Sequence, residues 1–275
     1  MKNLKLLFVL FISMIMLFSS CGKDEGEKKD DPALPSVEGG TIIKKYTFED
    51  MQYQYEYNSD SQLSKFKVGL IGSPDYTLVN FEYDGNKLLS YTANSGGEVA
   101  GKMIFMNHNA NDKPMRAEVY NGGGGPLELF QTFNFSYTGN DMTELISMQV
   151  VSGQEHILRK NEYTYEGGNL IQQKTFDFNN GSYYLNKTLD FTFDNKNNPA
   201  YIFGFINFAE TEIFMAMSVM DINNYVIVEL SDASGTALPQ ESFNRVFEYN
   251  TDGFPTKCTM TSFDSGEEYI MKYEY

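Results

Sequence analysis

A repeated unit runs along most of the chain and constrains its fold more than any other feature. Its clearest copy is Tyr163–Leu170 (YTYEGGNL), in which two aromatic residues alternate with a polar one, a polar turn follows, and an aliphatic residue restarts the chain. We call the last aromatic position before each such turn the anchor. The anchors are Tyr57, Tyr83, His108, Tyr137, Tyr165, Phe193, Met220 and Tyr249, with His108 and Met220 as degenerate members. They stand 25 to 29 residues apart, and such a regular period indicates a repeated supersecondary unit.

A second set of turn signals lies roughly midway between the anchors. Like the anchor turns, these segments are rich in residues that tolerate positive φ or hydrogen-bond to their own backbone. They are Gly72–Asp75, Asn94–Gly97, Asn121–Pro126, Ser152–Gly153, Asn179–Gly181, Asn207–Glu212, Ser231–Gly235 and Asp264–Gly266. Eight anchor turns and eight midway turns predict about seventeen strands. Because each connection is short, neighbouring strands must be antiparallel, and the simplest topology is a meander of hairpins.

Between the turns, apolar and polar residues alternate with the period of two that strands produce. In Ser182–Phe193 the odd positions, including Tyr183, Leu185 and Lys187, form the mostly apolar face. In Leu127–Tyr137 the apolar face is predicted to hold Leu127, Leu129, Phe133, Phe135 and Tyr137. The chain also contains 22 Phe and 19 Tyr, which suit pleated, half-buried surfaces. The predicted fold class is therefore all-β.

A long meander with one apolar face must cover that face. A strongly curved sheet, a flattened barrel or a sheet folded onto itself would bury it in the protein. Contact with lipid, as in outer-membrane barrels, is a third way to cover it. Lys187, Gln131, Arg159 and Asn161 interrupt the apolar faces, and both sets of turns are short. These features favour a protein interior over lipid contact.

The N-terminus carries the features of an export signal. Lys2 and Lys5 precede the apolar run Leu6–Phe18, which suits a signal peptide better than a membrane span. Leu17–Cys21 (LFSSC) resembles a bacterial lipobox, with Phe18 where Leu is more usual. That resemblance implies that Cys21 is lipidated, becomes the new N-terminus and joins the protein to a membrane. The alternative is an ordinary cleaved signal with an incidental cysteine.

The segment after Cys21 predicts a tether. Gly22–Pro32 has no apolar residue, so it has nothing with which to pack. Lys23, Asp24 and Glu25 resemble the Lys-then-acidic export signal of Bacteroidetes surface lipoproteins, which implies an outer-membrane location facing the medium, with the periplasmic face as the alternative. The expected organisation is a signal peptide over residues 1–20, a lipidated cysteine and disordered acidic tether over 21–40, and one β-repeat domain over 41–275.

Charge and cysteine usage limit the possible partners. The net charge is −16 and the pI is near 4.5, which excludes the positive footprint that nucleic-acid binding needs. If processing consumes Cys21, Cys258 has no partner for a disulfide. Cys258 lies in an alternating stretch with no base nearby in sequence, which predicts a buried, unreactive thiol.

The repeat itself resembles known repeat proteins. Its copies include Phe81–Asn86 (FEYDGN), Phe135–Asn140 (FSYTGN) and Phe247–Gly253 (FEYNTDG). The unit looks like the YD repeats of Rhs-type shells, although those are usually shorter. With the lipoprotein start, it is more similar to a Bacteroidetes family of lipoproteins of unknown function with a porin-like fold, over Thr41 to Tyr275. This resemblance implies a strongly curved antiparallel sheet and carries over no catalytic residue.

Few residues suggest chemistry. His108 and His156 form no zinc motif, no Gly-x-Ser-x-Gly elbow occurs, and Gly122–Gly125 lacks the helix start and Lys of a phosphate cradle. His108 is expected to replace an anchor aromatic, and His156 to be exposed. The turns Asn107–Asp112 and Asp194–Asn198 offer alternating oxygen ligands but lack the distal Glu of a calcium loop. We expect turn chemistry there and no catalytic residue, metal or cofactor.

The predicted function is that of a non-enzymatic surface lipoprotein, a binding or scaffold module for an extracellular glycan or protein. Tyr184 and Tyr76 are candidates for stacking on sugars, although the same residues could instead cover neighbouring strands. The sequence identifies no ligand. The alternative is a glycan-hydrolysing enzyme on a β scaffold, because 37 acidic residues allow many carboxylate pairs.

Overall fold

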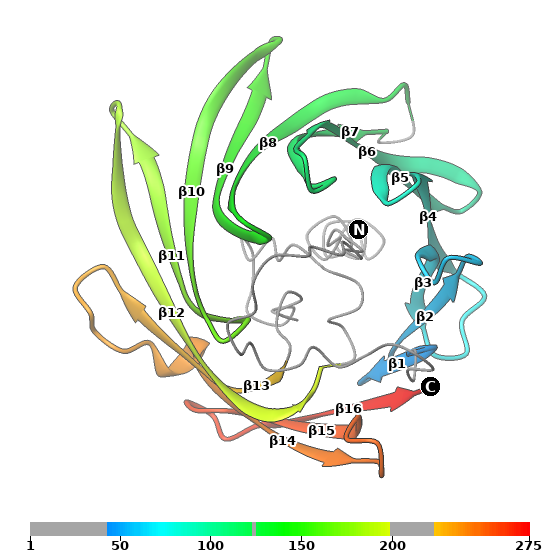
Figure 1. Ribbon diagram of the computed structural model, residues 1–275, viewed down its shortest axis with the longest axis vertical. Coiled ribbons are helices and arrows are strands. Elements are labelled where there is room, and N and C mark those ends of the chain that lie inside the picture. The colour runs from blue at the N-terminus through cyan, green and yellow to red at the C-terminus, as the bar shows by residue number, and fades with distance from the viewer. Residues whose placement is uncertain (1–42, 123–124, 199–222) are drawn as a thin grey trace.

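The computed structural model describes residues 43–122, 125–198 and 223–275. Sixteen strands in these residues form one closed antiparallel barrel, in which each strand pairs with its chain neighbours and β1 pairs with β16 (Figure 1). The strands are β1 (Lys45–Phe48), β2 (Met51–Tyr57), β3 (Leu63–Leu70), β4 (Tyr76–Asp84), β5 (Lys87–Ser95), β6 (Glu98–His108), β7 (Pro114–Asn121), β8 (Glu128–Thr138), β9 (Asp141–Val151), β10 (Gln154–Glu166), β11 (Asn169–Asn179), β12 (Ser182–Asn197), β13 (Asn223–Asp232), β14 (Phe243–Tyr249), β15 (Pro255–Ser262) and β16 (Glu268–Glu274). The predicted all-β meander is confirmed.

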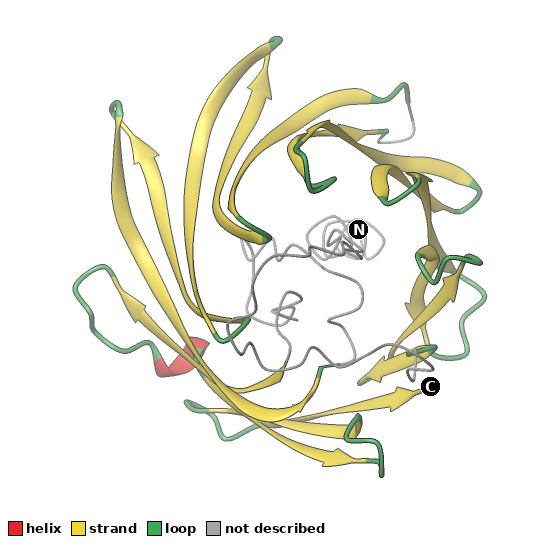
Figure 2. Ribbon diagram, viewed as in Figure 1, coloured by secondary structure: helices red, strands yellow, loops and turns green. Residues whose placement is uncertain are grey.

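Tight turns join most of these strands. In the β9–β10 and β11–β12 hairpins both loop residues have positive φ, at 53° and 76° for Ser152 and Gly153 and at 49° and 80° for Asn180 and Gly181. Such two-residue loops match the right-handed twist of the flanking strands. The longer connection between β13 and β14 contains the short 3₁₀ helix η3 (Pro239–Glu241), which Figure 2 shows in red.

The number of strands differs from the predicted seventeen for two reasons. The chain turns at Glu49–Asp50, where Glu49 has a φ of 49°, so the predicted first strand is divided into β1 and β2. The strand pair predicted around the Asn207–Glu212 turn and the Met220 anchor falls in residues 199–222, outside the described residues. Among the described strands, β12 pairs directly with β13, with Phe193 opposite Tyr225.

The apolar face of the sheet points into the barrel. Tyr46, Phe105, Phe135 and Leu145, on four different strands, are at most 7% exposed and belong to one hydrophobic cluster. Aromatic rings contact one another along this face, as Tyr46 does with Tyr53 at a centroid distance of 5.1 Å. Pairs of this kind contribute about 0.5–1.5 kcal/mol beyond their buried area. The interior is therefore the core of the protein.

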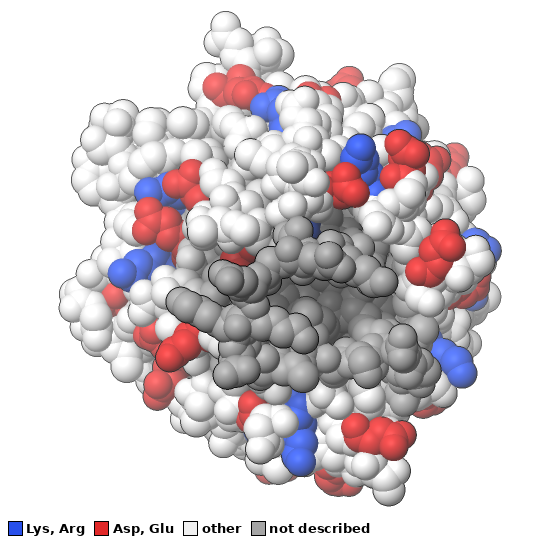
Figure 3. Space-filling model, viewed as in Figure 1, with Lys and Arg blue, Asp and Glu red and all other residues white. Residues whose placement is uncertain are grey.

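The outward face carries the charged side chains. Lys45 forms an ion pair with Glu274 at 2.8 Å, Lys257 with Glu248 at 2.7 Å and Lys65 with Glu56 at 3.2 Å, each between neighbouring strands. Charged groups are also spread around the visible end of the barrel (Figure 3). Exposed pairs like these contribute only about 0–1 kcal/mol each to stability. They mark the face of the sheet that is in contact with water.

Each of five anchor hairpins contains the same β-bulge. The strand that follows the turn has one extra residue. The anchor aromatic therefore pairs with a residue one position earlier in that strand than a regular register would give. The resulting pairs are Tyr57 with Leu63, Tyr83 with Leu88, Tyr137 with Met142, Tyr165 with Leu170, and Tyr249 with Pro255. A bulge strengthens the local twist and bends the strand. Repeated around the barrel, it curves the sheet toward closure.

Hydroxyl groups hold three of these bulges. The extra residues Ser64, Thr143 and Thr256 each donate a side-chain hydrogen bond across the hairpin to a backbone carbonyl. For Thr256 the acceptor is the carbonyl of Glu248, at 3.2 Å. The aliphatic partners of the anchors are at the same time buried, and Leu88 is 0% exposed. The motif therefore supplies both the bend and a core contact.

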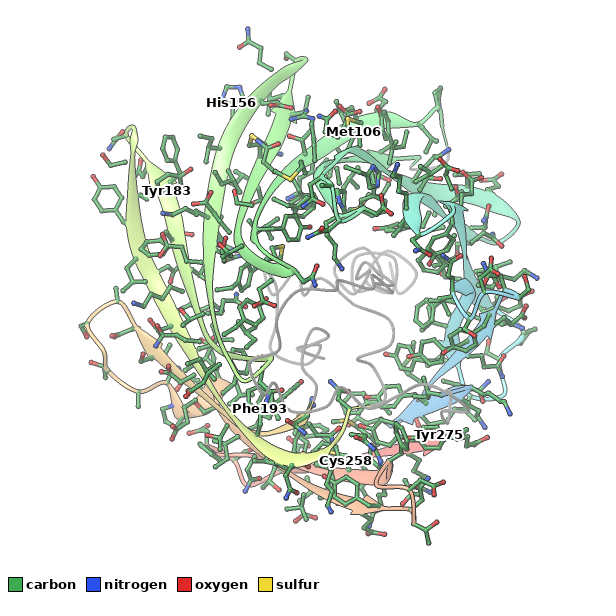
Figure 4. The ribbon with its side chains drawn as sticks, viewed as in Figure 1. Met106, His156, Tyr183, Phe193, Cys258 and Tyr275 are labelled. Atoms are coloured by element: carbon green, nitrogen blue, oxygen red, sulfur yellow. The ribbon has the colours of Figure 1, made fainter. Side chains whose placement is uncertain are left out.

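In two further strands, a bulge places some residues on the opposite face of the sheet from the one predicted. Thr175 pairs with Lys187 but Phe176 with Leu185, so an extra residue, Asn186, moves Tyr183 and Leu185 to the face opposite Lys187. Tyr183 accordingly lies on the part of the β11–β12 hairpin far from the barrel centre (Figure 4). The predicted single face holds from Lys187 to Phe193 only.

The same shift occurs in β8. Val119 pairs with Gln131 but Tyr120 with Leu129, which leaves Phe130 as the extra residue and puts Leu129 on the opposite face from Phe133. In both strands the period of two is intact in the sequence. In the folded sheet the bulge moves the residues beyond it to the other face. Its position depends on the pairing with the neighbouring strand.

Candidate functional site

The residues with the strongest sequence assignments lie outside the described part of the chain. Cys21, the predicted lipidation site, and Lys23, Asp24 and Glu25, the predicted export signal, all precede residue 43. The first described strand, β1, starts at Lys45. The tether and its modification therefore remain predictions from the sequence.

His108 occupies its anchor position as a structural residue. It lies at the end of β6 opposite Pro114, is partly buried, and its Nε2 is 3.0 Å from the carbonyl oxygen of Leu88. It therefore replaces the usual tyrosine in the sheet, as expected. His156 is exposed near the start of β10, which confirms the prediction of its exposure.

The two tyrosines proposed for sugar stacking are exposed on hairpins at the same end of the barrel. Tyr184, next to the β11–β12 turn, is 57% exposed, and Tyr76, at the start of β4, is 44% exposed. The Nζ atom of Lys67 lies 3.8 Å from the centroid of the Tyr76 ring, so one of its faces is occupied. Tyr184 is the better placed of the two for an external ligand.

The oxygen-rich turns use their side chains to hold the backbone. Asp194 accepts hydrogen bonds from the backbone amides of Lys196 and Asn224 and from the hydroxyl of Tyr249. Desolvation and this contact with Asp194 raise the pKa of Tyr249 above its usual value. In the other turn, Asn109 accepts from the amides of Asn111 and Lys113. Asn109 thus stabilises its turn, as expected. Asp194–Asn197, predicted as a turn, is instead the extended end of β12, where Asp194 hydrogen-bonds to residues of β13 and β14.

No arrangement suited to catalysis is evident in the described ranges. In residues 43–122, 125–198 and 223–275, no group of three or more His, Cys, Asp and Glu side chains is placed to hold a metal ion. Glu118 and Glu155 are brought together by Arg116, which pairs with both carboxylates. That guanidinium holds the pKa of Glu155 below its usual value through a hydrogen bond, so Glu155 is unsuited to be the protonated acid that glycoside hydrolysis needs.

Cys258 is a buried free thiol on β15, as predicted. It is 0% exposed, and burial raises its pKa to about 11, although the nearby Arg245 acts in the opposite direction. A thiol in this state is a poor nucleophile at neutral pH.

The inner wall contains buried polar side chains that the sequence analysis did not single out as a site. Asn161, Gln173 and Thr175 are at most 1% exposed, and Asn161 Oδ1 and Gln173 Oε1 have no hydrogen-bond partner among the described residues. On β14, Arg245 is 7% exposed between the inward residues Phe243 and Phe247. The signal that could have found Arg245 is its place in the alternating pattern, as a charge on an otherwise apolar face.

No helix within the described ranges is long and apolar enough to cross a membrane. No protein-family model matches the sequence, and no curated protein matches it either. Among solved structures, the chain is similar to a porin-like protein from Bacteroides uniformis, with 11% identity over 84% of this chain and 96% of that chain and a TM-score of 0.49. A porin-like protein from Bacteroides vulgatus gives 12% identity over 86% and 99%, with a TM-score of 0.47.

A more distant similarity connects the chain to a much larger protein. The structure of TcdB2-TccC3-TEV is 12% identical over 79% of this chain but only 11% of that chain, with a TM-score of 0.33. The expected resemblance to Bacteroidetes proteins with a porin-like fold is thus found among solved structures. At these identities the similarity concerns the arrangement of strands.

Proposed function

We propose that this protein is a non-enzymatic binding module, held by a lipid on Cys21 at the outer membrane and facing the cell exterior. The lipobox-like Leu17–Cys21 and the charged segment that follows it support the anchor and the tether. A single myristoyl-type chain binds membranes weakly, whereas lipoproteins with several acyl chains are held firmly. The barrel would then need no membrane contact of its own.

The observation that carries this proposal is the charged outer wall. The ion pairs of Lys45 with Glu274 and of Lys257 with Glu248 lie on the outward face. Each Lys placed on a lipid-facing barrel surface at the bilayer midplane costs about 2–4 kcal/mol. An outer wall with charges on β1, β14, β15 and β16 is suited to water. The N-terminal segment would therefore attach the protein to the membrane.

An extracellular glycan is the ligand class that we favour. Tyr184 offers an exposed aromatic ring at a hairpin tip, and Tyr76 offers another at the same end of the barrel. Aromatic rings present flat apolar faces with a polar edge, which suits the apolar face and hydroxyl rim of a sugar. Glu118 and Glu155 are both engaged by the guanidinium of Arg116, and we expect capture of the glycan without its cleavage.

The anchor is tested by cell fractionation. Cys21→Ala should move the protein from the membrane fraction to the soluble fraction, whereas Cys258→Ala should leave it in the membrane fraction. Protease treatment of intact cells should degrade the wild-type protein. A Cys21→Ala protein that stays with the membrane would contradict the lipid anchor, and full protection in intact cells would contradict the surface location.

The ligand is tested with a glycan array on the Cys21→Ala chain. We expect binding to at least one glycan, a strong loss with Tyr184→Ala, and no change with Val246→Ala, which removes an apolar side chain that is 64% exposed on the outer wall. A parallel hydrolysis screen distinguishes the alternative. Turnover that one Asp or Glu substitution abolishes would establish an enzyme and overturn the binding module.

A further inference from the structure

The three arginines of the chain fall into two classes. Arg116 forms ion pairs with Glu118 and Glu155, and Arg159 forms one with Asp177 at 3.0 Å. Arg245 forms no ion pair with any carboxylate in the described ranges, although it is the most buried of the three. Buried charges in proteins are normally paired, so Arg245 is the exception that requires an explanation.

The surroundings of Arg245 are aromatic. Its guanidinium carbon lies 4.1 Å from the ring centroid of Tyr225 on β13 and 5.3 Å from that of Phe243 on β14. Its Nε–H has no hydrogen-bond partner among the described residues. Stacking on ring faces positions a planar guanidinium and leaves its N–H donors available for hydrogen bonds.

The groups that act most strongly on its charge are weak acids. They are the phenols of Tyr225, Tyr273 and Tyr46 and the thiol of Cys258, contributed by β13, β16, β1 and β15. Burial lowers the pKa of Arg245, but these neighbours favour its cation and together raise the pKa above its usual value. Burial in turn keeps the Tyr46 and Tyr273 phenols protonated at neutral pH, since it raises the pKa of both.

The inner wall at Arg245 thus has a fixed positive charge and an Nε–H donor for which the described residues offer no acceptor. Tyr46 and Tyr273, whose ring centroids are 5.4 Å apart, add two neutral hydroxyl groups that can donate. A guanidinium with several N–H donors matches the oxygens of a carboxylate or a phosphate in a bidentate way.

We propose that the inner wall around Arg245 is a binding site for an oxyanion, the carboxylate or phosphate group of a small ligand. Arg245 supplies the charge and the bidentate donors, and the phenols around it supply the walls. The inference is independent of the glycan proposal, because Tyr184 on β12 and Tyr76 on β4 are exposed and belong to none of the strands that surround Arg245.

The site is tested by NMR of the arginine Nε–H groups in the whole Cys21→Ala chain. With three arginines, the spectrum has three such signals, and Arg245→Lys identifies one of them by its loss. If that variant does not fold, Arg116→Lys and Arg159→Lys assign the Arg245 signal by elimination. Sodium acetate and sodium phosphate are titrated separately, at an ionic strength held constant with sodium chloride.

We expect a saturable shift of the Arg245 signal with acetate, phosphate or both, while the signals of Arg116 and Arg159 stay in place. A response to acetate alone identifies a planar carboxylate as the ligand group, and a response to phosphate alone identifies a tetrahedral one. The thermal midpoint should rise with the same anion in the wild type and not in Arg245→Lys. No saturable shift with either anion, or equal shifts of all three signals, would overturn the proposal.

Discussion

The two ends of the barrel are built differently. At the anchor end, hairpin after hairpin repeats the same bulge and the same buried contact, such as Tyr83 with Leu88 and Tyr165 with Leu170. At the opposite, midway end the hairpins separate: β13 and β14 share only the pairs Ile227–Asn244 and Val228–Phe243. The tips of the β9–β10 and β11–β12 hairpins accordingly point away from the barrel (Figure 1).

Exposed apolar side chains follow the same division. Most of the large ones lie on hairpins of the midway end, namely Leu70, Ile71, Tyr76, Val99, Leu127, Phe130, Val151, Leu158, Tyr184, Phe263 and Ile270. Scattered exposed apolar residues are normal in any protein, but their concentration at one end is informative. The repeated motif thus determines the fold at the anchor end and leaves the midway end free to carry a ligand-binding surface.

The sharpest test of this division uses two adjacent leucines at the anchor end. Leu88 is 0% exposed as the partner of Tyr83, whereas Leu89 is the extra residue of the bulge and is 38% exposed. Leu88→Ala should lower the free energy of unfolding by about 2–5 kcal/mol, because it leaves a cavity. Leu89→Ala should change it by about 0.5 kcal/mol or less. Urea unfolding measures both, and similar losses would refute the assigned bulge.

A buried lysine should give the anchor end a pH dependence. Burial lowers the pKa of Lys113, in the β6–β7 turn, to about 8 from an ordinary 10.5, although Asp141 opposes the shift. Above pH 8 the folded chain has released this proton while the unfolded chain still binds it. Stability should therefore rise as pH increases, by up to about 1.4 kcal/mol per pH unit.

The measurement is urea unfolding between pH 7.5 and 9, below the ionisation of unfolded tyrosines, in a Cys258→Ala background. That background is needed because the unfolded thiol ionises near pH ~8.5, while burial raises the pKa of Cys258 in the folded chain, so the thiol would lower stability over the same window. Lys113→Met should remove the rise with pH. Lys196→Met, at the exposed end of β12, should keep it. A wild type whose stability is flat over this window would show that Lys113 is hydrated in the folded chain.

The hydroxyl groups in the bulges should have a smaller effect. Thr256→Val removes the hydrogen bond to the carbonyl of Glu248 and should cost about 0.5–1.5 kcal/mol, the usual net value of such a bond. Thr256→Ser keeps the hydroxyl and should retain most of the stability. If the two variants unfold at the same urea concentration, the turn alone determines the bulge.

The smallest effect is expected at the midway end. Tyr184→Ala removes a side chain that is 57% exposed and should change the free energy of unfolding by about 0.5 kcal/mol or less. Thermal unfolding measures this change. A large loss would show that Tyr184 is a structural residue and would remove it as a candidate for ligand contact.

The sequence predicted the anchor end better than the midway end, for a physical reason. An anchor turn is local: aromatic residues, a Gly or Asn turn and an aliphatic residue are all within one short segment, as in Tyr163–Leu170. The Glu49–Asp50 turn was missed because Glu49, the residue with positive φ, is of a type that rarely takes that conformation. The bulges at Phe130 and Asn186 were missed because they are properties of two strands together.

The candidate site was predictable only in part. Exposure of His156 and burial of Cys258 follow from their local patterns, and both predictions were confirmed. Arg245 differs, since its inward position can be read from Phe243 and Phe247, but its lack of a carboxylate depends on four other strands. The local period of the sequence carries no information about contacts among distant strands.

Closure between β1 and β16 converts the aromatic face of the sheet into an interior, and a disulfide tests it directly. Thr47 lies opposite Lys272, and the Cα separation of about 4.5–5.5 Å across an antiparallel pair suits a disulfide. In the Cys21→Ala chain, Thr47→Cys with Lys272→Cys should form an intramolecular disulfide under mild oxidation. Thr47→Cys with Glu268→Cys, which is displaced along β16 by about 13 Å, should not. Failure of the first pair to form, or disulfides between molecules only, would contradict a closed barrel.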